Sequence, residues 1–132
     1  MFSLDSKKVT SFTKINLVLS GMRLSEEFEI VCTGDESEIS RFTRLYSRDG
    51  ERRDLQDKST CSTKEMIDLL NMCGIMRWDG FRGRHPKGIK DGEMFRFSAE
   101  VNGGEIISAQ GSARFPMHYR DLKTGIKNLL KS

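Results

Sequence analysis

The stretch EMFRFSAEVNGGEIISAQG, residues 93–111, decides the fold class of this chain. Its first half alternates strictly between apolar and polar residues, the apolar ones being Phe95, Phe97, Ala99 and Val101. Alternation with a period of two is typical of a strand with one buried face. The turn Asn102-Gly103-Gly104 supplies residues that tolerate positive φ, as tight hairpins require. We therefore predict an antiparallel hairpin here, with residues 105–111 as its second strand.

Three more strands are predicted upstream of this hairpin. Residues 12–19 and 27–33 alternate in the same way, so we expect them to form a hairpin or meander. Residues 39–47 place apolar and charged side chains on one face, which an edge strand tolerates because charge there discourages unwanted pairing. Asp49-Gly50 then turns the chain. Residues 51–60 are charged and show no period, and we predict an exposed loop for them.

Two helices are also predicted. Ser62 with Glu65 three residues later forms a capping box at the start of the first helix. Its apolar stripe is Met66, Leu69, Leu70 and Cys73. Gly74 stands where a glycine ends a helix, and Phe115-Pro116 leads into the second helix. The stripe of that helix is Leu122, Ile126, Leu129 and Leu130.

These elements follow the order β-β-β-α-β-β-α. Separate runs of strands and helices are typical of an α+β protein, so we expect a single antiparallel sheet with the two helices packed on one face. The chain has 132 residues and shows no repeat or linker, which predicts a single α+β domain over residues 1–132.

The second half also resembles a group of small uncharacterised bacterial proteins. The shared motifs are a W-D-G-F turn at 78–81, a D-G-x-x-F hairpin start at 91–95 and an F-P-x-x-Y step at 115–119. Together they cover residues 78–122. The resemblance implies the architecture of this half and supplies no activity.

Composition excludes several classes of protein. Cys32, Cys61 and Cys73 form no C-x-x-C pair, and their spacing from His85 and His118 matches no zinc template. We therefore expect reduced thiols, no metal and no cofactor. The chain opens with no secretory signal pattern and holds no apolar run long enough to span a bilayer, which predicts a soluble cytoplasmic protein without a membrane partner.

The charge of the chain is concentrated in one segment. Residues 1–66 hold 11 Lys and Arg against 12 Asp and Glu, a net −1, while residues 67–132 hold 11 against 7, a net +4. Residues 77–90 alone carry this +4, because five cations there face only Asp79. We predict a basic loop that binds an anion, with these candidate residues: Arg77, Arg82, Arg84, His85, Lys87 and Lys90.

Two aromatic residues of the same segment have two possible roles. Trp78 and Phe81 either stack on a nucleobase, each contact contributing roughly 1–3 kcal/mol, or anchor the loop to the core. The loop cations likewise have a second interpretation, as a solvated surface balanced by the acids of the domain itself. The arginines of residues 41–53 are interleaved with acids and are expected to form a solvated face.

The sequence contains few groups of residues that could act together in catalysis. His85 and His118 are the only histidines, and no nucleophile elbow, phosphate loop or metalloprotease motif is present. Asp79 and Asp91, at the two ends of the basic loop, are either facing acids or turn formers; Asp-Gly pairs favour the turn. We expect no enzymatic activity.

Two hypotheses of function follow. The first is a non-catalytic binding or inhibitor protein, of bacterial or phage origin and possibly encoded by a mobile element. Its basic loop would engage an anionic partner: nucleic acid, a nucleotide-like ligand or an acidic protein groove. The alternative is a protein–protein interaction or oligomerisation module that uses the N-terminal sheet.

Overall fold

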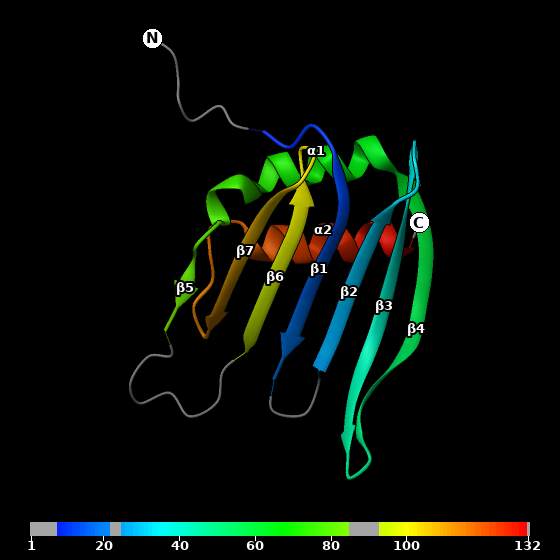
Figure 1. The fold of residues 1–132 in the computed structure, drawn as a ribbon, viewed down its shortest axis with the longest axis vertical. Coiled ribbons are helices and arrows are strands. Elements are labelled where there is room, and N and C mark those ends of the chain that lie inside the picture. Colours follow the sequence, from blue (N-terminus) through cyan, green and yellow to red (C-terminus); the bar gives the residue numbers. More distant parts are fainter. Residues whose placement is uncertain (1–7, 22–24, 85–92, 132) are drawn as a thin grey trace.

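The computed structural model describes residues 8–21, 25–84 and 93–131. Its elements, in chain order, are β1 (Phe12–Ser20), β2 (Ser25–Cys32), β3 (Glu36–Ser47), β4 (Gly50–Ser62), α1 (Thr63–Cys73), the 3₁₀ turn η1 (Ile75–Trp78), β5 (Arg82–Gly83), β6 (Met94–Val101), β7 (Glu105–Ser112) and α2 (Tyr119–Lys131). The protein is an α+β fold with one seven-stranded sheet in the order β4-β3-β2-β1-β6-β7-β5 (Figure 1).

The predicted hairpin is confirmed as β6 and β7, which pair in regular antiparallel register, with Phe97 opposite Ala109 and Ala99 opposite Ile107. Asn102, Gly103 and Gly104 all have positive φ, of 51°, 81° and 130°. Glycine and asparagine reach these angles at little steric cost, which is why the chain reverses at this point. The hairpin joins the sheet through β6, which pairs with β1.

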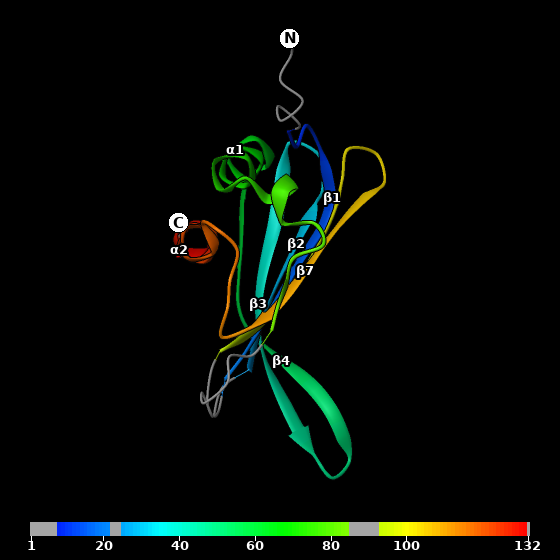
Figure 2. The ribbon, with the colours of Figure 1, turned by 90° about the vertical axis from the view of Figure 1, so that its left-hand side faces the viewer.

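Both helices cover the same face of the sheet, as predicted (Figure 2). The Ser62 hydroxyl accepts the Glu65 amide at 3.3 Å and caps the start of α1. Gly74 ends that helix with a φ of 65°. Met66 and Leu70 of α1, and Leu122 and Ile126 of α2, are fully buried over the sheet.

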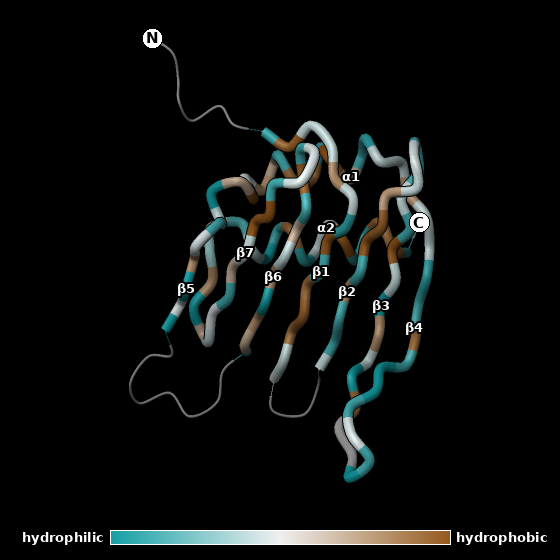
Figure 3. The backbone as a smooth tube through the Cα atoms, in the orientation of Figure 1, coloured by the Kyte–Doolittle hydropathy of each residue, from teal (hydrophilic) through white to brown (hydrophobic). Residues whose placement is uncertain are grey.

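Two predictions about the strands before α1 were wrong. Residues 51–60 belong to β4, which pairs along its length with β3, so four strands precede α1. Strand β3 is consequently an inner strand and not an edge. Half of the β3–β4 hairpin reaches beyond the helices and is mostly hydrophilic (Figures 2 and 3). Main-chain hydrogen bonds hold that half together, and since they need no buried face, no hydrophobic period marks β4.

The sheet is mixed and not purely antiparallel, because β5 runs parallel to β7. The Gly80 amide donates to the Ser108 carbonyl at 2.9 Å, and the Gln110 amide donates to the Phe81 carbonyl at 3.1 Å. The segment after η1 is thereby fixed along β7, where it covers main-chain groups that an edge strand would leave unpaired. The predicted element order lacked both η1 and β5.

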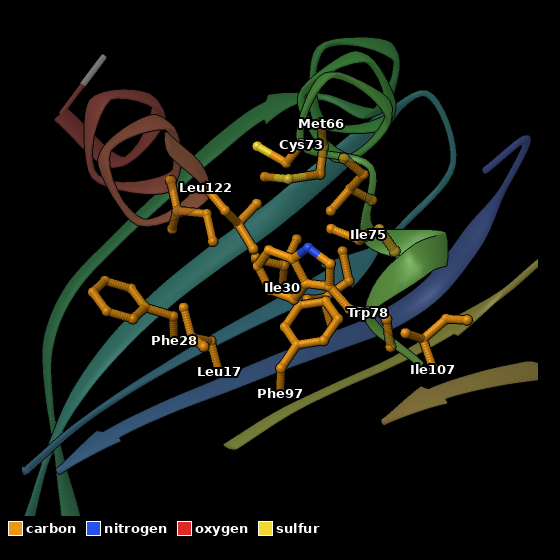
Figure 4. Close-up of a cluster of buried hydrophobic side chains, with 14 of the residues drawn as sticks. Leu17, Phe28, Ile30, Met66, Cys73, Ile75, Trp78, Phe97, Ile107 and Leu122 are labelled. Atoms are coloured by element: carbon orange, nitrogen blue, oxygen red, sulfur yellow. The ribbon is translucent and has the colours of Figure 1, made fainter. Parts of the chain in front are cut away.

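Trp78 lies at the centre of the core, between η1 and the sheet (Figure 4). Its ring is 2% exposed and meets Phe97 edge-on, with ring centroids 5.0 Å apart. Phe95 and Tyr119 continue this cluster, at 5.0 Å from one another. The aromatic rings therefore gather on the helix-covered face, and the opposite face of the sheet carries the polar residues of each strand.

Candidate functional site

The helix-free face of the sheet is built by the alternate residues that do not point to the core. Ile15 and Leu17 of β1 are buried under the helices, so Asn16 and Val18 lie on the other face. The register of β1 with β6 places Val18 beside Arg96. The register of β7 with β6 and β5 places Gln110 between Arg96 and Arg82. Strand pairing thus brings Arg82 and Arg96, which belong to different strands, to the same end of the helix-free face.

A hollow of about 430 Å³ lies at that end of the face. Four arginines line it: Arg44 from β3, Arg82 from β5, Arg84 just after β5, and Arg96 from β6. Ser20, Gln110 and Ser112 are polar neutral residues in the same wall. Among the described residues the wall contains no Asp or Glu. We call this hollow the arginine pocket.

The four guanidinium groups differ in whether a nearby carboxylate neutralises their charge. Arg44 lies 3.7 Å from Glu27 and also pairs with Glu51, so acids balance it. The Nη1 of Arg82 donates to the carbonyl oxygens of Phe81 at 2.7 Å and Ser108 at 3.2 Å, which orients the group without neutralising it.

Arg84 and Arg96 are the least compensated cations of the pocket. Both side chains are exposed, and neither has an acid within ion-pair distance in the part of the chain that the structure describes. Together with Arg82 they place three unmatched positive charges around one hollow. Because like charges repel each other and guanidinium groups bind oxyanions through paired N–H donors, the arrangement favours a bound anion.

The rest of the helix-free face is charged but internally balanced. Glu27 accepts from Asn16 at 2.6 Å and from Arg53 at 3.1 Å. Glu29 pairs with Lys14 at 3.5 Å and with Arg53 at 3.3 Å. This agrees with the expectation that the arginines of residues 41–53 form a solvated, matched surface. The arginine pocket differs from it because no acid is found among its described lining residues.

The structure brings together only part of the predicted anion site. Arg82 and Arg84 line the pocket, whereas Arg77 is exposed on the helix-covered side, in a different hollow. His85, Lys87, Lys90 and Asp91 lie outside the described residues.

The two aromatic candidates of the same segment anchor it to the core. Trp78 is buried, and its Nε1 donates to the Met117 carbonyl at 3.1 Å. Phe81 is half-buried and packs on Phe95 at 6.1 Å between ring centroids. Both rings pack against other aromatic rings of the core, so the anchoring interpretation fits the geometry.

Sequence reasoning missed Arg96 and Arg44 as pocket residues. Arg96 was interpreted only as part of the polar face of its hairpin, and Arg44 as part of a mixed charge row. The parallel pairing of β5 with β7 brings Arg82 next to the residues across from Arg96. Since a two-residue strand carries no detectable period, no signal in the sequence shows this neighbourhood.

Asp79 and His118 are the residues considered for catalysis that the structure describes. Asp79 accepts the Ser108 amide through Oδ1 at 3.0 Å, as a turn-forming aspartate does. His118 Nδ1 lies 2.9 Å from Asp121 Oδ2. Cys73 lines the same hollow as His118, but burial and the nearby Asp121 raise the pKa of this thiol to about 11. The thiol is therefore protonated at neutral pH and a poor nucleophile.

The described residues contain no group of three or more His, Cys, Asp or Glu side chains arranged to hold a metal ion. Nor does any helix among them reach the length and apolar character needed to cross a membrane. Searches against protein-family models, curated proteins and solved structures gave no match to this chain.

Proposed function

We propose that this protein is a non-catalytic binding protein, of the inhibitor kind, that engages an anionic partner through the arginine pocket. One observation carries the proposal: among the described residues, four arginines and no acid line the pocket, and three of these arginines have no carboxylate partner there. Domains seldom gather uncompensated like charges without a counter-charge, since the arrangement costs electrostatic free energy.

The position of the pocket supports this function. Its arginines come from β3, from β5 with the residue just after it, and from β6, so a sheet that is held on its other face by two helices positions the cations. Arg82 is additionally oriented by two main-chain carbonyls. A preoriented guanidinium loses less conformational entropy when it binds an anion, which increases the affinity.

Binding of two anionic polymers of different chemistry, polyphosphate and polyglutamate, tests the proposal. We expect titration to perturb the backbone amide resonances of β5, β6 and β7 first, with an affinity that falls steeply as salt is added. The double variant Arg84→Glu/Arg96→Glu should bind about tenfold or more weakly.

A charge-matched variant controls for net charge. Lys64 and Arg120 are exposed near the first turns of α1 and α2, on the helix-covered side, where glutamate is well tolerated. The variant Lys64→Glu/Arg120→Glu has the same net charge as the pocket variant and should bind like the native protein. Equal weakening in both variants would show that only overall charge matters, and would contradict the proposal.

A second candidate function is oligomerisation through the N-terminal strands. The β3–β4 hairpin extends past the helices and exposes Leu45 and Leu55, at 37% and 52%. Light-scattering mass measurement of the native chain and of Leu45→Asp/Leu55→Asp tests this function. A dimer that the double substitution converts to a monomer would support it, and a monomeric native chain would rule it out.

A further inference from the structure

Building on the anion-binding function proposed above, we infer that the partner is a protein, which inserts a segment rich in Asp and Glu into the arginine pocket and lays apolar side chains beside it. Three features of the helix-free face distinguish this partner from a nucleic acid: the charge next to the pocket, the exposed apolar residues, and the position of the aromatic rings.

The charge changes sign repeatedly just outside the pocket. Arg44 belongs both to the pocket and to a second hollow that Glu27 and Glu51 line. Glu27 belongs in turn to a third hollow, which also contains Glu29 and Glu100. A nucleic-acid strand carries a negative charge on every nucleotide, so a strand leaving the pocket in this direction would pass several carboxylates. A protein segment can carry its acids in one cluster and continue with neutral or basic residues.

Exposed apolar side chains lie on the same face as the pocket. Met94 lines the pocket and is 53% exposed, and Ile106, which lines the third hollow, is equally exposed. The register of β3 and β4 pairs Leu55 with Phe42 on this face. Protein interfaces combine such apolar contacts with charged pairs, whereas interfaces with nucleic acid are dominated by contacts to phosphate and sugar.

Among the aromatic side chains that the structure describes, none on this face is available for base stacking. Phe42 is half-buried, and the guanidinium of Arg53 covers its ring at 4.0 Å from the centroid. Trp78 and Phe97 are buried on the other side of the sheet. Proteins that bind single strands without sequence preference rely on such rings. The lack of a free ring among the described side chains of this face therefore favours a partner recognised by charge and apolar contact.

Carboxylates match the chemistry of the pocket. Arginine binds a carboxylate through two parallel N–H donors, and Arg84 and Arg96 have no acid that competes for these donors among the described residues. Gln110 and Ser20 add neutral polar side chains to the wall. An acidic cluster in the pocket with an apolar residue against Met94 would use both kinds of surface at once.

Parallel selections from a random peptide library and a random single-stranded oligonucleotide pool test this inference on the native chain. We expect the peptides to converge on clusters of Asp and Glu next to an apolar residue. The selected peptides should bind Arg84→Glu/Arg96→Glu about tenfold or more weakly, and bind Lys64→Glu/Arg120→Glu as they bind the native chain. Circular dichroism and thermal midpoints establish that each variant is folded.

Met94→Gln separates the two partner classes, because it keeps the size of the side chain and removes its apolar character. It should weaken the selected peptides roughly three- to tenfold and leave oligonucleotide binding unchanged. If oligonucleotides bind more tightly than peptides, and lose binding in the arginine variant, the protein partner is wrong while the anion-binding function stands.

Two further outcomes are equally decisive. Selected peptides that bind the arginine variant as well as the native chain would contradict both the inference and the function on which it rests. Failure to enrich any peptide would overturn the inference alone, since the titration with polyphosphate and polyglutamate decides the anion-binding function separately.

Discussion

The indole Nε1 of Trp78 donates a hydrogen bond to the main-chain carbonyl of Met117, at 3.1 Å. This bond connects η1, which leads into β5 and the arginine pocket, with the segment that enters α2. The ring itself lies between Phe97 and Tyr119, at centroid distances of 5.0 and 6.4 Å. One side chain thus links the segment before β5 both to the core and to the start of α2.

Substitution of Trp78 should destabilise the whole domain. Trp78→Ala removes a fully buried ring, and we expect it to lower the free energy of unfolding by about 3–5 kcal/mol. Trp78→Phe keeps most of the packing but leaves the Met117 carbonyl without its donor, and should cost about 1–3 kcal/mol. Trp78 is the only tryptophan, so urea unfolding is followed by far-UV circular dichroism. Native-like stability of Trp78→Phe would contradict the role given to the hydrogen bond.

Asp79 is expected to contribute to stability through an oxygen acceptor and not through its charge. Asp79→Asn retains an oxygen for the Ser108 amide and should be close to the native protein in stability. Asp79→Ala removes the acceptor and should cost about 1 kcal/mol, with faster hydrogen exchange at the Ser108 amide. Equal losses in both variants would indicate that the negative charge matters instead.

Gly111 and Gly125 differ in what an added Cβ atom would contact. A Cβ on Gly111 would meet the Arg114 backbone oxygen and lie 2.8 Å from a ring carbon of Phe95, so we expect Gly111→Ala to cost about 2–3 kcal/mol. A Cβ on Gly125 would meet only the end of the Leu69 side chain, at 2.5 Å.

Leu69 can rotate away from a new methyl group, and alanine is favoured over glycine inside a helix by about 1 kcal/mol. Gly125→Ala should therefore stay within about 1 kcal/mol of the native stability, since the two effects oppose each other. Thermal unfolding of the two variants side by side measures the contrast. A larger loss in Gly125→Ala than in Gly111→Ala would be incompatible with this packing.

Stability should decline between about pH 9 and 11 in part because of Cys73. Burial and the nearby Asp121 raise the pKa of this thiol from 9.0 to about 11. The unfolded chain then loses the thiol proton at a lower pH than the native protein does, so the contribution is complete below pH 9 and is lost as the pH rises towards 11. Urea unfolding across this range should give a shallower decline for Cys73→Ala than for the native chain; parallel slopes would disprove the linkage.

The parts of the fold that the sequence predicts are those encoded by neighbouring residues. The cap at Ser62, the end of α1 at Gly74 and the turn at Asn102 all depend on local backbone angles, and each is confirmed. Strand β4 was missed because its outer half has no buried face, and β5 because two residues show no pattern. Both strands form only because β3 or β7 offers main-chain groups from a distant part of the chain.

Prediction of the candidate site from sequence has the same limit, because contacts between distant parts of the chain leave no local pattern. Clustering in the sequence identified Arg82 and Arg84, but Arg44 and Arg96 reach the pocket only through the order of strands in the sheet. The alternation of side chains along each strand decides which face the arginines occupy. Charge counting along the chain cannot tell a matched arginine such as Arg44 from an unmatched one such as Arg96, because the matching acids are brought close by strand pairing.

The central position of β1 has a consequence for synthesis on the ribosome. Strand β1 pairs with β2 immediately, but its other edge waits for β6, since Phe12 lies opposite Val101 and Ser20 opposite Met94. A nascent chain that has emerged only as far as α1 therefore displays an unsatisfied strand with Ile15 and Leu17 beside it. Once the final third of the polypeptide has left the ribosome, β6 can pair with β1. Until then the nascent chain is most prone to associate with other chains.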